Sequence, residues 1–204
     1  MSIKRLAIAG IIAAALTLTA CSNGGPTNPT TSPSETPTPT PTATSITGDA
    51  PADENEAIDK AEQTIELLLK INAEVSAAGG TDPSPYDAVA TGNALEDLRA
   101  DANRIANGPI LNEDGESIEG QATVEGSLVF EPKTAYGQEW QGVENGLVIV
   151  PGCLDNSGRL ITTADGKPAM TNPNPRNEVE YHVIFDADLK TWLVTDRISL
   201  GTTC

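Results

Sequence analysis

Apolar residues recur at helical spacing in two segments of the chain. The first segment begins after Asp53, which has capping-box spacing to Glu56, and ends before the Gly79-Gly80 pair. Its apolar stripe consists of Ile58, Ala61, Ile65, Leu68 and Val75. After the turn-rich segment 81–86, a second stripe runs up to Gly108-Pro109 and consists of Leu95, Leu98, Ala102 and Ile105. Both stripes predict amphipathic helices whose apolar faces form core.

Alternating apolar and polar positions predict strands after residue 117. Residues 117–131 keep one parity apolar and predict a long strand, and "GLVIVPGCL" (146–154) predicts a buried one. Residues 177–185 also alternate, and "DADLK" turns the chain into a last strand over 191–200. The inward face of 177–185 consists of Val179, Tyr181, Val183 and Phe185. The order predicts an α+β fold, in which N-terminal helices pack on a curved antiparallel sheet of about four strands.

The amino terminus predicts export. Lys4 and Arg5 precede "LAIAGIIAAALTL" (6–18), which has 13 residues without a charge. A membrane-spanning helix needs about 20 apolar residues, so this run fits a signal peptide better than a permanent anchor. Leu18-Thr19-Ala20-Cys21 resembles the bacterial lipobox. The resemblance implies a lipoprotein signal peptide over 1–20, cleavage after Ala20, and a Cys21 that carries diacylglycerol and palmitate. The alternative is an ordinary secreted protein in which Cys21 is incidental.

Proline and threonine dominate the next segment. Residues 21–52, with "TPTPTPT", contain only one large apolar side chain, Ile46. Such a segment buries too little apolar surface to offset the entropy of ordering it. The sequence therefore predicts a disordered linker over 21–52 and one small globular domain over 53–204.

The net charge of −17 narrows the classes of partner. Nucleic-acid binding depends on basic patches, and binding flat on anionic lipid also needs cationic residues. We therefore expect no nucleic-acid partner and membrane attachment only through the lipid anchor, where paired acyl chains give stable binding. A cell-wall component or another protein is the expected partner class, and the sequence leaves the oligomeric state open.

With Cys21 lipidated, Cys153 and Cys204 remain. An exported domain meets oxidising conditions, so we predict a Cys153–Cys204 disulfide. The alternatives are two free thiols or a redox pair, but no Cys-x-x-Cys spacing supports redox activity.

The sequence assigns no catalytic residue, no metal ligand and no cofactor. His182 is the only histidine, and alternation along 177–185 points it away from the helix-covered face. The sequence therefore lacks the base for a Ser-His-Asp or Cys-His arrangement, and it lacks the nitrogen and sulfur ligands for a zinc site. The carboxylate clusters at 112–117 and 186–190 do not match a twelve-residue calcium loop and fit turns better.

One resemblance covers residues 55–204. "ALEDLRADANRIANG", "VIVPGCLDNSGRLITTADGKP", "EVEYHVIFDADLKTWLVTD" and the final cysteine resemble small actinobacterial lipoproteins with a domain of the nuclear transport factor 2-like superfamily. This superfamily includes SnoaL-type cyclases and ketosteroid isomerases. The resemblance implies a cone-like fold whose pocket opens between the helices and the concave sheet face. It makes Tyr181 and Trp192 candidate pocket residues, with Tyr136 or Tyr86 at the rim, although core packing also accounts for Tyr181 and Trp192.

These patterns favour a non-catalytic binding or scaffold module on the outer face of the cytoplasmic membrane. The motivation is an anchor and a spacer beside a domain without a recognisable catalytic set. Two alternatives are a pocket-based isomerase or hydrolase of the SnoaL or ketosteroid-isomerase type and a prophage surface lipoprotein. A transport-linked solute-binding protein is disfavoured because the domain lacks a second lobe.

The lipobox generates a direct prediction. Cells grown with a clickable fatty acid should label the wild-type protein, whereas the Cys21→Ala variant should carry no label because the thiol that receives the lipid is gone. In-gel fluorescence of the purified chains measures this difference. Equal labelling of both chains would contradict the prediction that Cys21 carries the lipid anchor.

Overall fold

The computed structural model describes residues 44–204. The predictions for the signal peptide 1–20, its cleavage residues Leu18, Thr19 and Ala20, and the lipidation of Cys21 fall outside these residues. Within residues 44–204, no helix is both long enough and apolar enough to cross a membrane.

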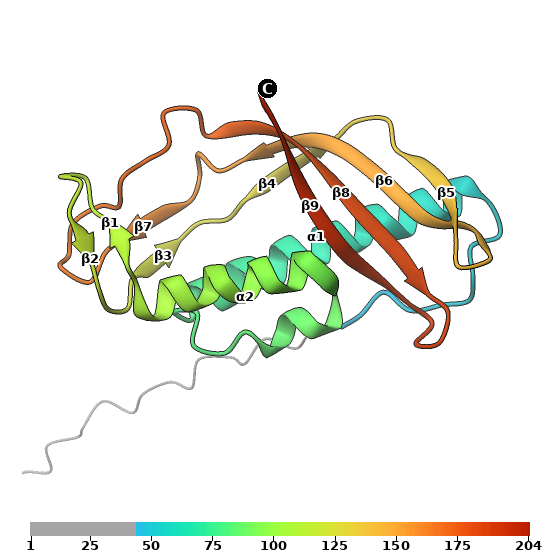
Figure 1. The fold of residues 1–204 in the computed structure, drawn as a ribbon, viewed down its shortest axis with the longest axis horizontal. Helices are drawn as coiled ribbons and strands as arrows, with labels where there is room; N and C mark the ends of the chain where they lie inside the picture. Colours follow the sequence, from blue (N-terminus) through green and yellow to red (C-terminus); the bar gives the residue numbers. More distant parts are fainter. Residues whose placement is uncertain (1–43) are drawn as a thin grey trace, which may run out of the picture. The chain divides into compact units, whose positions relative to one another are not determined.

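Helices precede strands along the described chain (Figure 1). The two α-helices are α1 (Glu54–Ala77) and α2 (Gly92–Asn107), with the short 3-10 helix η1 (Ser84–Ala88) between them. The strands are β1 (Ile110–Leu111), β2 (Ser117–Ile118), β3 (Thr123–Glu125), β4 (Val129–Pro132), β5 (Tyr136–Trp140), β6 (Val143–Asp155), β7 (Leu160–Thr162), β8 (Arg176–Asp186) and β9 (Thr191–Thr203).

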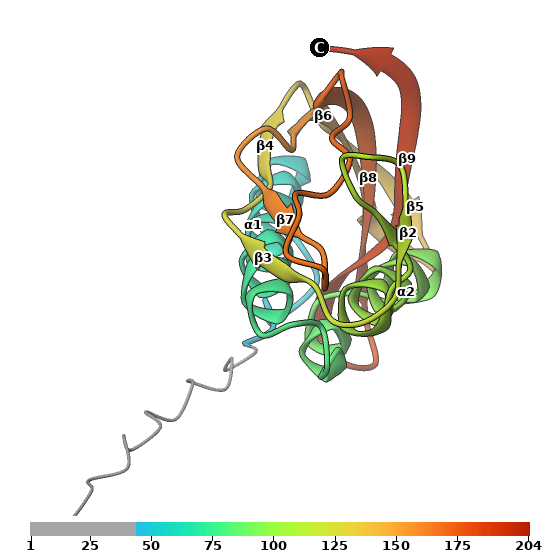
Figure 2. The same cartoon turned by 90° about the vertical axis from the view of Figure 1, so that its left-hand side faces the viewer.

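The main sheet is antiparallel and has five strands. Its strand order is β4-β6-β8-β9. The fifth strand, β5, pairs with residues 143–149 of β6, whereas β4 pairs with residues 152–155 of the same strand. The predicted α+β class, with helices on an antiparallel sheet, is therefore confirmed, and the sheet has one strand more than expected because residues 136–140 also pair. The smaller pairs β1–β2 and β3–β7 lie at the end of the domain that faces the viewer in Figure 2.

Local signals set the limits of α1 as predicted. The Asp53 carboxylate accepts a hydrogen bond from the Glu56 N–H at 2.9 Å, and the Glu56 carboxylate accepts one from the Ala52 N–H at 2.9 Å. These contacts satisfy amides that have no partner inside the helix. At the other end, Gly79 and Gly80 have φ values of +80° and +70°, which end the helix at low steric cost.

The predicted long strand over 117–131 is wrong. The segment forms three short strands, β2, β3 and β4, that belong to three different sheets. Gly120 and Gly126 separate them with φ values of +105° and +78°, which an extended strand does not contain. Ala122 and Val124 are still buried, as their shared parity predicts.

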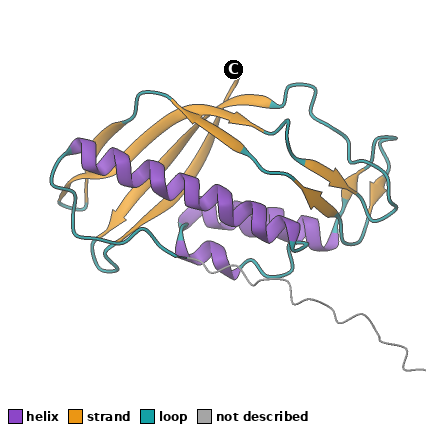
Figure 3. Cartoon of the chain, turned by 180° about the vertical axis from the view of Figure 1, so that it is seen from behind, coloured by secondary structure: helices purple, strands orange, loops and turns teal. Residues whose placement is uncertain are grey.

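The core lies between the helices and one face of the main sheet (Figure 3). The predicted inward face of β8 is confirmed, because Val179, Tyr181, Val183 and Phe185 are all buried. Trp192 of β9 lies against Phe185, and the rings of Tyr181 and Phe130 form a T-shaped pair with their centres 5.0 Å apart. Most residues of the two predicted helix stripes also belong to this core, whereas Ile58 and Leu95 are only partly buried against it and Ile105 is buried outside it.

The described residues begin inside the segment assigned to the linker. The carbonyl of Ile46 accepts hydrogen bonds from the Trp192 N–H at 2.9 Å and from the Thr191 hydroxyl at 3.1 Å. The Gly48 N–H donates to the Lys190 carbonyl at 3.0 Å. Residues 46–48 therefore lie along the start of β9 and form part of the domain.

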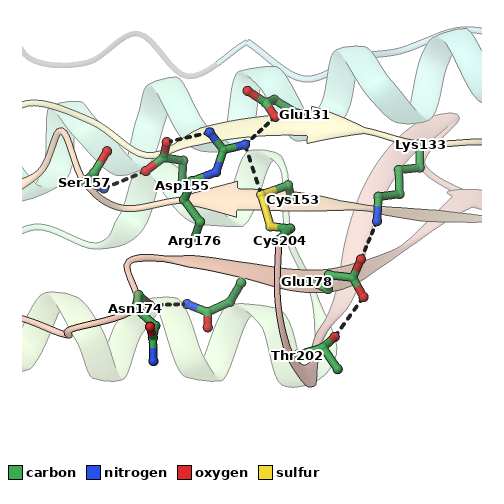
Figure 4. Close-up of a disulfide and its surroundings, with 11 residues drawn as sticks. Glu131, Lys133, Cys153, Asp155, Ser157, Asn174, Arg176, Glu178, Thr202 and Cys204 are labelled. Atoms are coloured by element: carbon green, nitrogen blue, oxygen red, sulfur yellow. Dashed lines mark hydrogen bonds and ion pairs between the residues drawn. A yellow bond between two sulfur atoms is a disulfide. The ribbon is translucent and has the colours of Figure 1, made fainter.

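The predicted disulfide joins Cys153 of β6 to Cys204, with their Cα atoms 6.0 Å apart (Figure 4). Cys153 pairs in register with Glu178, on the face of the sheet opposite the helices. The Arg176 guanidinium lies beside it and donates to the Cys153 sulfur at 3.4 Å and to Glu131 at 2.7 Å. Lys133 pairs with Glu178, whose other oxygen accepts the Thr202 hydroxyl at 2.8 Å. The disulfide and these contacts attach the end of β9 to the sheet.

The disulfide generates a prediction about stability. Cys153 and Cys204 are 51 residues apart, so the Cys153→Ala/Cys204→Ala variant should lose about 4 kcal/mol of unfolding free energy in the chain-entropy model. For a domain of this size, the loss lowers Tm by roughly 10 °C. Calorimetry measures the shift, and reduction of the wild type should produce the same one. A variant as stable as the wild type contradicts the prediction.

Candidate functional site

An open cavity lies between the two helices and one end of the main sheet. Its volume is about 280 Å³. Its apolar lining consists of Leu128, Leu154, Pro175 and Val179. Its polar lining consists of Asn72, Asp101, Asn156, Arg159, Asn177, Arg197 and Ser199. We call it the arginine cavity, because Arg159 and Arg197 line it.

A small apolar hollow continues the arginine cavity towards the core. It measures about 20 Å³ and shares Asn72, Leu128 and Arg197 with the cavity. Tyr181, one of the two predicted pocket residues, lines this hollow with only 1% of its surface exposed. Trp192, the other, lines neither space and packs in the core against Phe185.

Arg159 reaches the cavity from the turn that follows β6. The Asp155 carboxylate accepts the Ser157 N–H at 2.8 Å, and the Arg159 N–H donates to the Asn156 carbonyl at 3.2 Å, so the turn is fixed by local hydrogen bonds. The guanidinium donates to the Ser76 hydroxyl of α1 at 3.2 Å. Burial lowers the pKa of Arg159. The charges of Asp101 and Tyr86 raise this pKa, and the positive charge of Arg197 lowers it.

Arg197 reaches the cavity because β9 contains a bulge. Val194 pairs with Val183 and Asp196 pairs with His182, which leaves Thr195 as an extra residue. After the bulge, Arg197 pairs with Tyr181 and shares its helix-covered face. Burial raises the pKa of Tyr181, and the neighbouring Arg197 guanidinium partly offsets that rise.

Asn72 and Tyr86 form a buried pair behind the cavity wall. The Asn72 amide donates to the Tyr86 hydroxyl at 3.1 Å, and the two residues are 7% and 1% exposed. Burial raises the pKa of Tyr86 to about 12. Since a buried polar group is costly without a partner, this bond fixes η1 against α1 and holds Asn72 in place.

Asp101 is the single carboxylate in the lining of the arginine cavity. It lies on α2, where it accepts a hydrogen bond from the Arg104 guanidinium at 3.2 Å. Its negative charge is therefore already partly neutralised by a residue that does not line the cavity.

The other residues considered from the sequence lie elsewhere. His182 contacts Glu180 at 2.7 Å on the face of the sheet opposite the helices, the direction that alternation predicts. Tyr136 is 42% exposed on β5 and does not line the cavity, whereas Tyr86 lies buried behind it. The segment 112–117 is a turn organised by the buried Asn112 side chain, which accepts the N–H groups of Asp114 and Glu116. Within residues 44–204, no group of three or more histidine, cysteine or acidic residues is arranged to hold a metal ion.

The sequence patterns did not predict Arg159, Arg197 and Asn72 as residues of the cavity. Asn72 carried a usable signal, because it follows Leu68 by four residues and therefore places an amide on the apolar stripe of α1. Arg159 lies in a turn and Arg197 lies after a bulge, so neither position follows from periodicity.

Comparisons with known proteins give no family. No family model and no curated protein matches the chain. Among solved structures, it is similar to the intermembrane-space region of the chloroplast protein ARC6, with a TM-score of 0.48 and 11% identity over 71% of this chain and 96% of that one. It is also similar to the putative transfer protein TraH from the Gram-positive conjugative plasmid pIP501, with a TM-score of 0.40 and 13% identity over 71% of this chain and 94% of that one. Function is therefore inferred from the cavity and the sequence.

The buried pair predicts how stability depends on alkaline pH. The folded-state pKa of Tyr86, about 12, exceeds the value of about 10 in an unfolded chain, so the folded state holds the phenolic proton more tightly. Its contribution is complete below pH 10 and is lost as the pH rises to about 12, on the order of 3 kcal/mol in total.

The Tyr86→Phe variant tests this contribution. At pH 8 it should be less stable than the wild type by about 1–3 kcal/mol, because Asn72 loses its buried partner. The difference should shrink between pH 10 and pH 11.5, because the variant has no phenol to ionise. Urea unfolding at each pH measures it, and Tyr136→Phe serves as an exposed control. A difference that stays constant over this range contradicts the prediction.

Proposed function

We propose that this protein is an extracytoplasmic lipoprotein whose domain is a non-catalytic binding module. In this proposal, lipid on Cys21 attaches it to the outer face of the cytoplasmic membrane, and the Pro/Thr-rich segment acts as a spacer. The signal-peptide pattern of residues 1–20 and the lipobox resemblance support the location. The arginine cavity carries the binding role.

The dimensions and lining of the arginine cavity suit a small ligand. Its volume of about 280 Å³ equals about nine water molecules and is near the lower end for ligand pockets. Apolar side chains from β6 and β8 line one part, and directional polar groups such as Arg197 and Asn72 line another. That combination buries a ligand and fixes its orientation.

The chemistry of the lining favours binding over catalysis. It contains guanidinium, amide and hydroxyl groups, and its only carboxylate, Asp101, is held by Arg104. It contains neither histidine nor cysteine, so a nucleophile paired with a base is not available among these side chains.

A pocket-based isomerase is the second candidate function. It is favoured by the presence of Asp101 in the cavity and of Tyr181 in the adjoining hollow, since a carboxylate base and a tyrosine donor are the groups that the family resemblance implies. An Asp101→Asn variant separates the two functions: a binding module keeps its ligand affinity, whereas an isomerase loses turnover.

We also propose that the domain is a cone-like member of the nuclear transport factor 2-like superfamily. Two features support this proposal. Both helices cover one face of an antiparallel sheet, and the cavity opens between that face and the helices, where the resemblance implies a pocket.

Filling the cavity tests the binding role. A Ser199→Trp variant places an indole at the cavity lining, where Ser199 is exposed, and should abolish ligand retention. The control is Ile198→Trp, because Ile198 is 42% exposed and pairs with Glu180 on the opposite face.

The full-length chain in detergent would be incubated with a small-molecule extract of the producing cells, desalted and denatured, and the released compounds identified by mass spectrometry. We expect a compound retained by the wild type and by Ile198→Trp but not by Ser199→Trp. The absence of any retained compound, or equal retention by all three chains, contradicts the proposal.

A further inference from the structure

The distribution of charged pairs singles out two arginines. Residues 44–204 contain five arginines. Three of them have a carboxylate partner: Arg99 with Asp87 at 2.6 Å, Arg104 with Asp101 at 3.2 Å, and Arg176 with Glu131 at 2.7 Å. Within the described part of the chain, neither Arg159 nor Arg197 lies within ion-pair distance of a carboxylate.

Both of these arginines line the same cavity. In a chain with 29 acidic and 12 basic residues, carboxylate partners are abundant, so two guanidiniums without one are unusual. Both are partly buried, and a charged group removed from water is costly unless it is paired. An anion from outside the chain would supply the missing partner.

The neighbouring groups leave the two guanidiniums available. Arg159 donates a hydrogen bond to the neutral Ser76 hydroxyl. This bond fixes the position of the guanidinium but does not neutralise its charge. The Asn72 amide is occupied by Tyr86, and the Asn177 amide donates to the Asn174 carbonyl at 3.1 Å. The positive charge of Arg197 lowers the pKa of Arg159, so the two guanidiniums lie close enough to repel each other. A bound anion relieves this repulsion.

We propose that the arginine cavity binds a small ligand through an oxyanion, a carboxylate or a phosphate, held between Arg159 and Arg197. Planar guanidinium forks match the oxygen pairs of both groups. The apolar side of the cavity, with Leu154 and Val179, then accepts the remainder of the ligand. This inference deepens the proposed binding function and rests on it.

Calorimetric titration of the full-length chain in detergent tests the proposal. The probes are inorganic phosphate and acetate, each at constant ionic strength with chloride as the background anion. We expect saturable binding of at least one probe, and the tighter probe identifies the oxyanion. Arg159→Gln and Arg197→Gln should each weaken binding about tenfold or more, the usual contribution of a hydrogen bond to a charged group. Arg99→Gln, which removes an arginine already paired on the surface of α2, should bind like the wild type.

A second measurement needs no variant and therefore does not depend on folding of the substituted chains. Phenylglyoxal modifies accessible arginines, and peptide mass spectrometry locates the adducts. The binding probe should protect Arg159 and Arg197 of the wild-type protein while Arg99 reacts as before.

The outcomes separate this inference from the proposed function. No saturable binding of either probe, or no protection of Arg159 and Arg197, overturns the anion site. If the Ser199→Trp experiment still shows a retained compound in that case, the binding module stands with a different ligand chemistry. If binding persists unchanged in folded Arg159→Gln/Arg197→Gln protein, the anion binds elsewhere and the proposal is wrong.

Discussion

The bulge at Thr195 divides β9 into two parts with different roles. Before the bulge, Trp192 and Val194 face the helices and complete the core. After it, Arg197 occupies the helix-covered face and Ser199 follows it, so the same face becomes polar and open. If Thr195 were paired in regular alternation and not bulged, Asp196 would point to this face, and the cavity would lose a guanidinium and gain a carboxylate. The bulge in this sequence thus sets the sign of the charge that the sheet presents to the cavity.

Helix α1 contributes buried polar residues to the same end of the domain. Its stripe buries Ile65 and Leu68 in the core, and in its last turns the buried polar residues Asn72 and Ser76 stand beside the buried Ile71 and Val75. Each has a specific partner, Tyr86 for Asn72 and Arg159 for Ser76. Buried polar groups with partners cost little stability and fix geometry. Apolar packing therefore extends along the whole helix, and hydrogen bonds are added at the end where the cavity opens.

The sequence predicted those elements whose determinants are local. The cap at Asp53 and the Gly79-Gly80 pair act within a few residues, and β8 keeps an unbroken alternation, so α1 and β8 were confirmed. The prediction of one long strand over 117–131 was wrong because alternation treats Gly120 and Gly126 as ordinary strand positions, although their conformations interrupt the strand. The position of Arg197 could not be predicted for a different reason. The direction of its side chain depends on how β9 pairs with β8, which is a long-range property. Arg159 depends on the packing of a turn against α1.

The docking of residues 46–48 beside Lys190 has a consequence for access. The chain enters the domain at the β8–β9 turn, whereas the cavity uses Arg197 and Ser199 further along β9. At about 3.3 Å per strand residue, roughly 25 Å separates Thr191 from Ser199. The contacts of residues 46–48 and the lining of the cavity thus lie at different ends of one strand. Residues 46–48 therefore contribute nothing to the lining of the arginine cavity, whose guanidiniums come from elements further along the chain.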